Sequence, residues 1–539
     1  MKAGDLLAPS RRGVRWGAAA GATFAGTPVP GLPPAQPHLT RPAPSRLFLV
    51  GLLAVAGATI AAVMASALSP ALAVLPVAAV TVAWVASRVP LRWSATALLL
   101  LLLVPDDRVE TVGQWRSPLA VIGDVIHYRL DAIAGVPGLA VTGMEVILGL
   151  LLVVWLRRRV AGAAIDEAGQ VPAAAPLRTF VLLYVAGVLL AEGFGLARGL
   201  PAVPWKLRNL LHPIALALLF LAAFRGPRDH RLLGRVVVFA AAFKAALALV
   251  VQRIAVVETG GMYDWATSHG DSVLASVALF LVLGDAVAHP TRRRLLQATL
   301  ISALLLDGAV ANNRRIFWVM VILTLVVAYA VSPMRGWKLG LTRFLVVAAP
   351  VVALYVAVGW NRSGAPFGPV QTLRGIVDSS VNRSSYWREV EDWNIAMSIR
   401  QVTWTGTGLG GQYTEIMPND DISGSYKEYR EWPHNNFLGL LLLLGPFGFT
   451  AVSALSGLVV FLAFRSFRRA THVDDKVAAF GCLAAVVACH AMSWGDLGSH
   501  FPQYKVFMAL AIAVAARLAV ATGAWPARRA GVGAAHPGR

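Results

Sequence analysis

The stretch EWPHNNFLGLLLLLGPFG, residues 431–448, places an imidazole and two amides directly before a long apolar run. The side chain of His434 changes charge near neutral pH, so it can serve as a general base toward a hydroxyl group. Asn435 and Asn436 could orient this imidazole, bind sugar hydroxyl groups, or cap a helix that begins there. The residue types at this junction therefore suit proton abstraction from a hydroxyl group.

Arginines stand at the ends of other apolar runs or in the segment before His434. Arg208 lies in WKLRNLLHP, Arg314 and Arg315 in NNRRIFW, and Arg383 in RSSYW. A guanidinium group matches the geometry of a phosphate, and a diphosphate can engage more than one such group. These arginines predict an anionic ligand; the alternative for each is that it reaches toward lipid headgroups.

The composition predicts that these residues are carried by membrane-spanning helices. Of 539 residues, 57% are hydrophobic and 14% are charged, which argues against a soluble protein. We predict an all-α, polytopic transmembrane bundle with about fourteen spans. They lie near 46–66, 70–87, 92–104, 139–156, 177–194, 207–224, 236–253, 270–288, 295–310, 316–333, 343–360, 435–463, 476–494 and 503–522.

The distribution of charge predicts the orientation of the bundle. One alternating set of loops holds most of the 48 Lys and Arg but few of the 28 Asp and Glu. Basic loops face the cytoplasm, so both termini are expected there. The net charge of +20 then reports orientation and does not indicate nucleic acid as a partner.

The chain is expected to have one membrane domain, 46–522, between two polar extensions. Residues 1–45 and 523–539 contain no apolar run and are predicted to be disordered cytoplasmic segments. The first span would act as the insertion signal. Cys482 and Cys489 are seven residues apart on one predicted helix, roughly 10 Å along its axis, so they are expected to be packing residues and not a disulfide.

The longest loop on the expected outer face is 361–434, and it ends at the candidate base. Its stretch 383–399 repeats apolar residues at three- and four-residue spacing and predicts a helix lying in the membrane interface, with Tyr386 and Trp387 at headgroup depth. In the following TWTGTGLGGQY, Gly406 and Gly408 permit tight turns and close backbone approach.

Over residues 310–450 these motifs resemble the O-antigen ligase and O-antigen polymerase superfamily. The similar stretches are NNRRIFW, RSSYW, GTGLGG and HNNFLGLLLLLGPFG. The resemblance implies a membrane glycosyltransferase of the helical, GT-C-like type in the plasma (inner) membrane. Its donor would be a glycan on a polyprenyl diphosphate such as undecaprenyl diphosphate, presented at the outer leaflet, and its acceptor a glycan or lipid.

The resemblance also implies roles for particular residues. Arg315, or its neighbour Arg314, would bind the diphosphate together with Arg208 and Arg383, and His434 would activate the acceptor hydroxyl for transfer with inversion. No cofactor and no metal is implied, because arginines would neutralise the diphosphate. The fourteen spans and the long outer loop favour a polymerase over a ligase.

Competing interpretations rest on other polar residues. Asp106 and Asp107 in VPDDRVE could hold a hard cation, although adjacent acids at a helix end are more often solvated. The polar stretches 264–272 and 494–500 could line an acceptor channel. A lipid-linked oligosaccharide flippase or other transporter would place ionisable residues inside the bundle, where the sequence has mainly Lys244, Glu145 and Glu192.

Overall fold

The structure is a computed structural model, and it describes most of the predicted membrane domain. The described residues are 81–105, 117–130, 141–160, 171–200, 203–261, 266–333 and 336–526, apart from 83, 86, 118, 129, 363, 379, 381, 382, 424, 425 and 427. All of them belong to one unit, residues 56–539. The segment 1–45, the predicted span 46–66, most of 70–87 and most of 523–539 lie outside the described residues.

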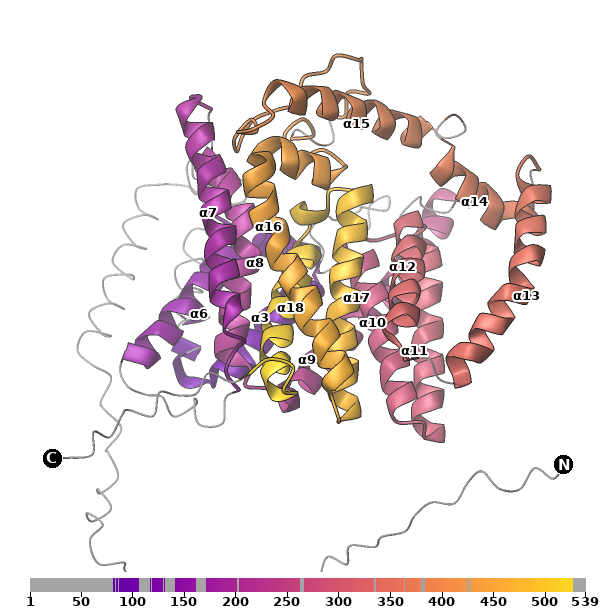
Figure 1. The fold of residues 1–539 in the computed structure, drawn as a ribbon, viewed down its shortest axis with the longest axis horizontal. Helices are drawn as coiled ribbons and strands as arrows, with labels where there is room; N and C mark the ends of the chain where they lie inside the picture. Colours follow the sequence, from indigo (N-terminus) through magenta and orange to yellow (C-terminus); the bar gives the residue numbers. More distant parts are fainter. Residues whose placement is uncertain are drawn as a thin grey trace, which may run out of the picture. The chain divides into compact units, whose positions relative to one another are not determined.

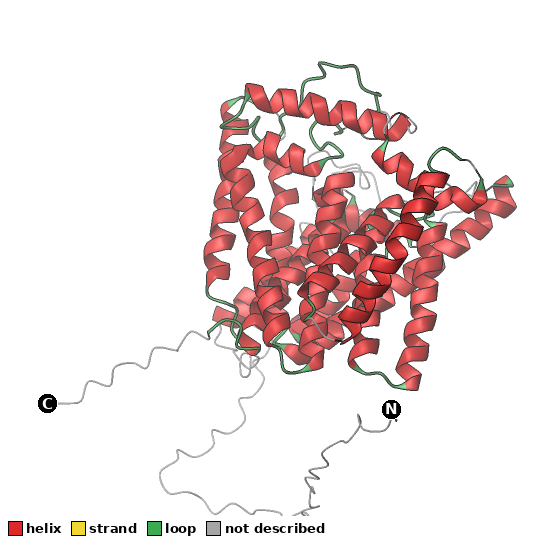
Figure 2. Cartoon of the chain, turned by 45° about the vertical axis from the view of Figure 1, so that its right-hand side comes forward, coloured by secondary structure: helices red, strands yellow, loops and turns green. Residues whose placement is uncertain are grey.

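The described residues form helices and no β-strand (Figure 2). The first helices with defined bounds are α3 (Leu91–Leu103), α4 (Ala120–His127), α6 (Gly143–Val160), α7 (Pro176–Ala197), α8 (Val203–Ala223), α9 (Pro227–Thr259), α10 (Asp271–Ala288), α11 (Arg292–Ala311), α12 (Arg315–Val331) and α13 (Gly336–Gly359). They are followed by η2 (Ala365–Phe367), α14 (Gly368–Val377), α15 (Arg383–Gln401), α16 (Asn436–Arg469), α17 (Val473–Gly495), η4 (Gly498–His500) and α18 (Pro502–Ala521).

Nine of the described helices are long and apolar enough to cross a membrane, namely α7 to α11, α13 and α16 to α18. This confirms the predicted all-helical class and indicates a multi-pass membrane protein. Every predicted span from 92–104 onward coincides with a helix. However, α3 and α12 are shorter apolar helices, and α6 ends in three arginines, so the count of fourteen spans stays a prediction.

Helix α18 is the centre of the bundle. In its most apolar stretch, 83% of the residues are buried, more than in any other of the nine helices. It packs against α8, α16 and α17 (Figure 1). Its sequence is rich in alanine, and small side chains allow helices to approach closely where lipid gives no hydrophobic drive to associate.

The predicted interfacial helix is α15, which runs across one end of the bundle over α16 and α17 (Figure 1). Its helical state confirms the prediction for 383–399, but its buried face differs from the apolar face expected. That face includes Glu391, Asn394 and Ser398 beside Val390 and Ile395. These polar groups are buried because they bind the segments that surround α15: the Asn394 amide, for example, bonds the backbone of Ile416 and Met417.

The glycine segment that follows α15, GTGLGG at 406–411, forms hydrogen bonds to α16 where that helix is interrupted. Pro446 has no backbone N–H, and Gly445 leaves the helical conformation (φ 63°, ψ 176°), so nearby carbonyls lose their usual partners. The N–H groups of Thr407 and Gly408 donate to the carbonyls of Leu442 and Leu443, at 2.7 and 3.1 Å. The two stretches predicted separately, GTGLGG and LLGPFG, are thus one structural joint.

Gly406 is required at this joint, for two reasons. Its φ is 66°, and a Cβ there would lie 2.5 Å from the Gly445 nitrogen and 2.6 Å from the Leu442 carbonyl oxygen. The Arg198 guanidinium also donates to the Gly406 carbonyl at 2.6 Å, which ties the segment to the end of α7.

We therefore expect Gly406→Ala to destabilise the protein by about 2 kcal/mol or more, because the substitution adds a left-handed penalty to a backbone clash. Thermal unfolding of the detergent-solubilised protein measures the effect. The matched control is Gly457→Ala on α16, where a Cβ meets nothing within 4 Å. Equal melting temperatures for the two variants would contradict this role of the joint.

Candidate active site

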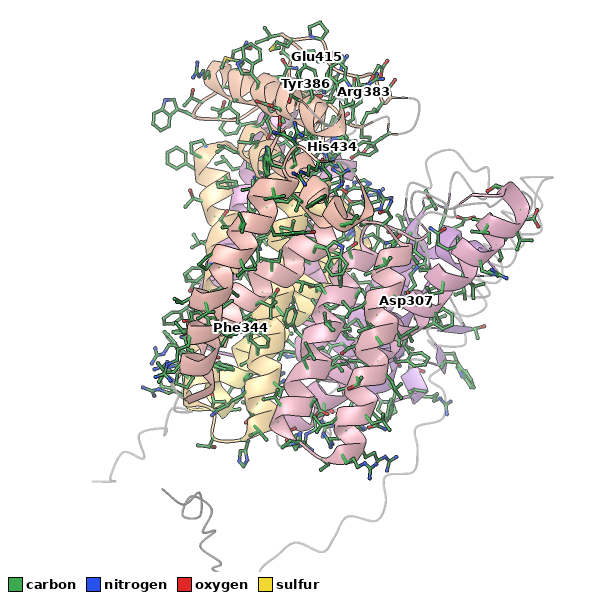
Figure 3. All side chains as sticks on the ribbon, turned by 90° about the vertical axis from the view of Figure 1, so that its right-hand side faces the viewer. Asp307, Phe344, Arg383, Tyr386, Glu415 and His434 are labelled. Atoms are coloured by element: carbon green, nitrogen blue, oxygen red, sulfur yellow. The ribbon has the colours of Figure 1, made fainter. Side chains whose placement is uncertain are left out.

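His434 lies at the start of α16, directly against a buried carboxylate of α15. Its Nδ1 is 3.1 Å from Glu391 Oε2, and its backbone N–H donates to the same oxygen at 3.1 Å. The Glu391 side chain is 2% exposed, whereas that of His434 is 26% exposed. In Figure 3, His434 lies at the same end of the bundle as Arg383 and Tyr386 of α15.

This geometry fixes how the imidazole can react. Because Glu391 accepts the Nδ1–H, the lone pair of the neutral ring is on Nε2, which is the atom left to take a proton. Burial lowers the pKa of His434, but the hydrogen bond and charge of Glu391, with a further contribution from Asp496, raise it more, so the net pKa lies above the ordinary value. The pair has the arrangement of a general base held by an orienting carboxylate.

The residue next to Glu391 supports the same junction. Asp392 accepts a hydrogen bond from the Asn435 amide at 3.2 Å, and burial raises the pKa of Asp392 to about 6. Asn435 in turn caps α16, since its side-chain oxygen accepts the Leu438 N–H at 3.3 Å. The capping alternative foreseen for Asn435 is therefore what the structure shows, and it holds His434 at the helix start.

His434 lines a cavity of about 390 Å³ whose wall includes residues of α15. The lining residues are Arg383, Ser384, Trp387, Arg388, Glu391, Asn419, Asp420, Ile422, Tyr429 and His434. The cavity thus offers two guanidinium groups, two carboxylates, an amide and two aromatic rings, a mixture suited to a charged and hydroxylated ligand.

The two arginines of the cavity are held differently. The Arg383 side chain is 78% exposed and lies 3.5 Å from Asp420, a weak surface pair. Arg388 donates from Nη1 to the carbonyl of Gly495 at 2.6 Å, which fixes it against the end of α17. Arg388 was given no role from the sequence; its three-residue spacing from Glu391 on one helix was the available signal.

Arg208 lies in a different cluster and does not line this cavity. It is 3.3 Å from Glu145, which also contacts His212 at 2.8 Å. Glu145 further accepts the Thr142 N–H at 2.7 Å, while the Thr142 hydroxyl accepts the Glu145 N–H. Arg208 therefore contacts a capping box at the start of α6, which gives it a structural role that the sequence did not reveal.

The two arginines at the start of α12 face different surroundings. Arg315 is exposed, whereas the Nε and Nη2 atoms of Arg314 are buried. This end of α12 lies beside the end of α17, since a Cβ on Gly495 would be 2.9 Å from Ile316. Neither arginine lines the cavity at His434, but both belong to the helix end next to it.

The remaining predicted site residues divide into two groups. Trp387 lines the cavity and packs edge-on against Tyr386, with ring centroids 5.3 Å apart. Gly406 and Gly408 lie in the α16 joint and not at the cavity. Asn436 is buried, and its side-chain oxygen accepts the Ser499 N–H at 3.3 Å, which links α16 to η4. The acceptor roles given to these residues stay predictions.

Asp106 and Asp107, for which a metal site was the alternative hypothesis, lie outside the described residues. Within the described part of the chain, Asp285, His289 and Asp474 are close enough to hold a cation. They lie at the opposite end of the bundle, where Arg294 pairs with Asp285 and Arg231 pairs with Asp474. Their charges are thus already compensated by arginines.

No protein-family model matches the chain, and no curated protein matches its sequence. The function is therefore inferred from the residues of the site.

We expect Glu391→Gln to lower the pKa of His434, because the substitution removes the carboxylate that stabilises the imidazolium. Diethyl pyrocarbonate reacts with neutral imidazole, so the pH dependence of His434 labelling, read by mass spectrometry, reports this pKa. The labelling midpoint should fall by roughly one pH unit. Glu389→Gln, on the exposed side of α15, is the matched control and should leave it unchanged. An unchanged midpoint in Glu391→Gln would disprove the pairing.

Proposed function

We propose that this protein is a membrane glycosyltransferase of the O-antigen ligase and polymerase kind, using a glycan on a polyprenyl diphosphate as donor. The observation that carries the proposal is the His434–Glu391 pair in the wall of an arginine-lined cavity, at the end of a bundle of apolar helices. Such a site can bind a diphosphate and deprotonate a hydroxyl group next to the membrane.

In the proposed reaction, Nε2 of His434 takes the proton of an acceptor hydroxyl. The acceptor oxygen then bonds to the anomeric carbon of the donor, while the bond from that carbon to the diphosphate oxygen breaks. The electron pair leaves with the polyprenyl diphosphate, and attack from the opposite side inverts the anomeric carbon. Glu391 balances the charge of the imidazolium, and the proton then passes to solvent.

Arg383 and Arg388 are the cavity groups that can bind the diphosphate and stabilise the charge it gains on leaving. Arg388 is added to the set predicted from the sequence. Arg314 or Arg315, at the neighbouring start of α12, can extend this set, whereas Arg208 would have to exchange Glu145 for the ligand. The mechanism therefore assigns the main diphosphate contacts to α15.

The proposed orientation puts the cavity on the outer side of the plasma membrane and both termini in the cytoplasm. It is supported by the basic loops, which lie at the other end of the helices: Arg292 to Arg294 open α11, and Arg468 and Arg469 close α16. A donor lipid in the outer leaflet would then present its diphosphate at the depth of α15.

A flippase is the alternative from another class, and one observation favours it. Lys244 of α9 and Asp271 of α10 form an ion pair at 3.0 Å inside the bundle, with exposed fractions of 3% and 6%. Buried ionisable pairs are common on substrate or ion pathways in transporters. The transfer experiment below distinguishes the two functions.

The orientation is tested by single cysteines at exposed positions of the two ends, Ser423→Cys and Thr471→Cys. The natural cysteines are both buried, so they give little background. A membrane-impermeant maleimide added to intact cells should label Cys at 423 and leave Cys at 471 unlabelled until the membrane is opened. The reverse pattern would place the cavity in the cytoplasm and contradict the proposal.

The chemistry is tested with the protein in lipid vesicles and a polyprenyl-diphosphate-linked oligosaccharide. We expect glycan transfer that falls at least about 100-fold in His434→Ala, as for loss of a general base. Longer glycans without another acceptor would indicate a polymerase, and transfer only to an added acceptor a ligase.

The matched control is His289→Ala, a histidine of similar exposure at the opposite end, which should keep full activity. Movement of the lipid across the bilayer without glycan transfer would contradict the proposed enzyme and support the flippase. Transfer that persists in His434→Ala would refute His434 as the base.

A further inference from the structure

Two polar segments that the proposed mechanism does not use meet beside the cavity. The segment 266–270 precedes α10, and the segment 495–501 connects α17 to α18. His269 of the first donates its Nδ1–H to Asp496 of the second. The His269 ring also stacks on Phe501, with centroids 5.9 Å apart and planes 11° apart. His269 is thus held by a hydrogen bond and by ring packing.

Asp496 is a buried carboxylate with defined partners. It is 5% exposed, and its Oδ1 accepts the Leu497 N–H at 2.8 Å while Oδ2 accepts from His269. Burial raises the pKa of Asp496, but the charges of His269, Arg388 and His434 lower it by more, so the net pKa lies well below the usual range. Asp496 therefore carries a negative charge inside the protein.

This charge acts on the candidate base. Arg388 binds the carbonyl of Gly495, the residue before Asp496, and lines the same cavity as His434. The charge of Asp496 favours protonation of His434. The groups that act on His434 are thus Glu391, which touches it, together with Arg388, Asp392 and Asp496, which act through their charge.

We propose that His269 is a positioning residue for His434: its bond to Asp496 holds that carboxylate in place and offsets its charge, so that His434 stays available as a base. The inference starts from the contact between His269 and Asp496 and from the bond of Arg388 to the neighbouring Gly495, and its catalytic consequence rests on the proposed function. Nothing in the pattern of either segment identified this link, because His269 and Asp496 are 227 residues apart in the sequence.

The direction of the effect follows from the charges. Without the His269 donor, the full charge of Asp496 acts on His434 and stabilises its imidazolium. His434 then loses its proton only at higher pH. Removing the Asp496 carboxylate lowers the pKa of His434 instead. His269 then has no carboxylate through which to change that pKa.

The test measures the labelling of His434 by diethyl pyrocarbonate against pH, in the purified full-length protein. His269→Phe keeps the ring stack on Phe501 but removes the donor, and should raise the labelling midpoint of His434 by roughly half to one pH unit. His269→Asn places an amide N–H near the position of Nδ1 and should restore most of the wild-type midpoint. His289, at the far end of the bundle, is the internal reference and should not shift.

The decisive comparison is a double-mutant cycle. Asp496→Asn should lower the midpoint of His434, and His269→Phe should add no shift in that background. An unchanged midpoint in folded His269→Phe, or a His269→Phe shift that persists without Asp496, would overturn the proposal. If His269→Phe does not fold, an unchanged midpoint in Asp496→Asn overturns it equally.

This test does not depend on the substrate. In the transfer assay, the acidic limb of the pH–rate profile of His269→Phe should move to higher pH, whereas a purely structural defect would lower the rate at every pH. If the wild-type protein transfers no glycan, the proposed function fails, while the labelling cycle still decides whether His269 controls His434.

Discussion

The site depends on how the protein supplies hydrogen-bond donors to the backbone carbonyls at a break in an apolar helix, α16. Where Gly445 and Pro446 interrupt α16, the carbonyls of Leu442 and Leu443 need donors, because an unpaired backbone group at this depth is costly. The glycine segment supplies these donors. Because of these hydrogen bonds, the segment that follows α15 packs on α16. This contact holds α15 over the residues that begin α16.

The position of His434 follows from that arrangement. Since α15 is held at both the joint and the Asn394 contacts, Glu391 projects onto the start of α16 and accepts from both the backbone and the ring of His434. A second clamp joins the loop to α8: Lys206 pairs with Glu428 at 2.7 Å and Glu431 at 2.6 Å, just before Pro433. A base with an orienting carboxylate is thus assembled by a long loop that is anchored to the bundle on two sides.

Charge compensation is the other principle that organises this end of the molecule. The described carboxylates near His434 have identified partners: Glu391 pairs with His434, Asp496 with His269 and Asp420 with Arg383, whereas Asp392 accepts a hydrogen bond from the neutral Asn435 amide. Such pairing is expected where groups leave bulk water. It leaves Arg383, exposed at the mouth of the cavity, as a group that can turn to an anionic ligand with little to give up.

The sequence by itself determined the helices, because hydrophobic runs and interface residues are local patterns: every predicted span within the described residues is a helix, and α15 begins at Arg383. It also singled out His434, through its place at the mouth of an apolar run. Only the tertiary structure decided its partners. The links from His434 to Glu391 and from Asp496 to His269 join residues far apart in the chain, as does the bond from Arg208 to Glu145 that removes Arg208 from the cavity. No local pattern encodes such pairs, because they form only when separate helices pack.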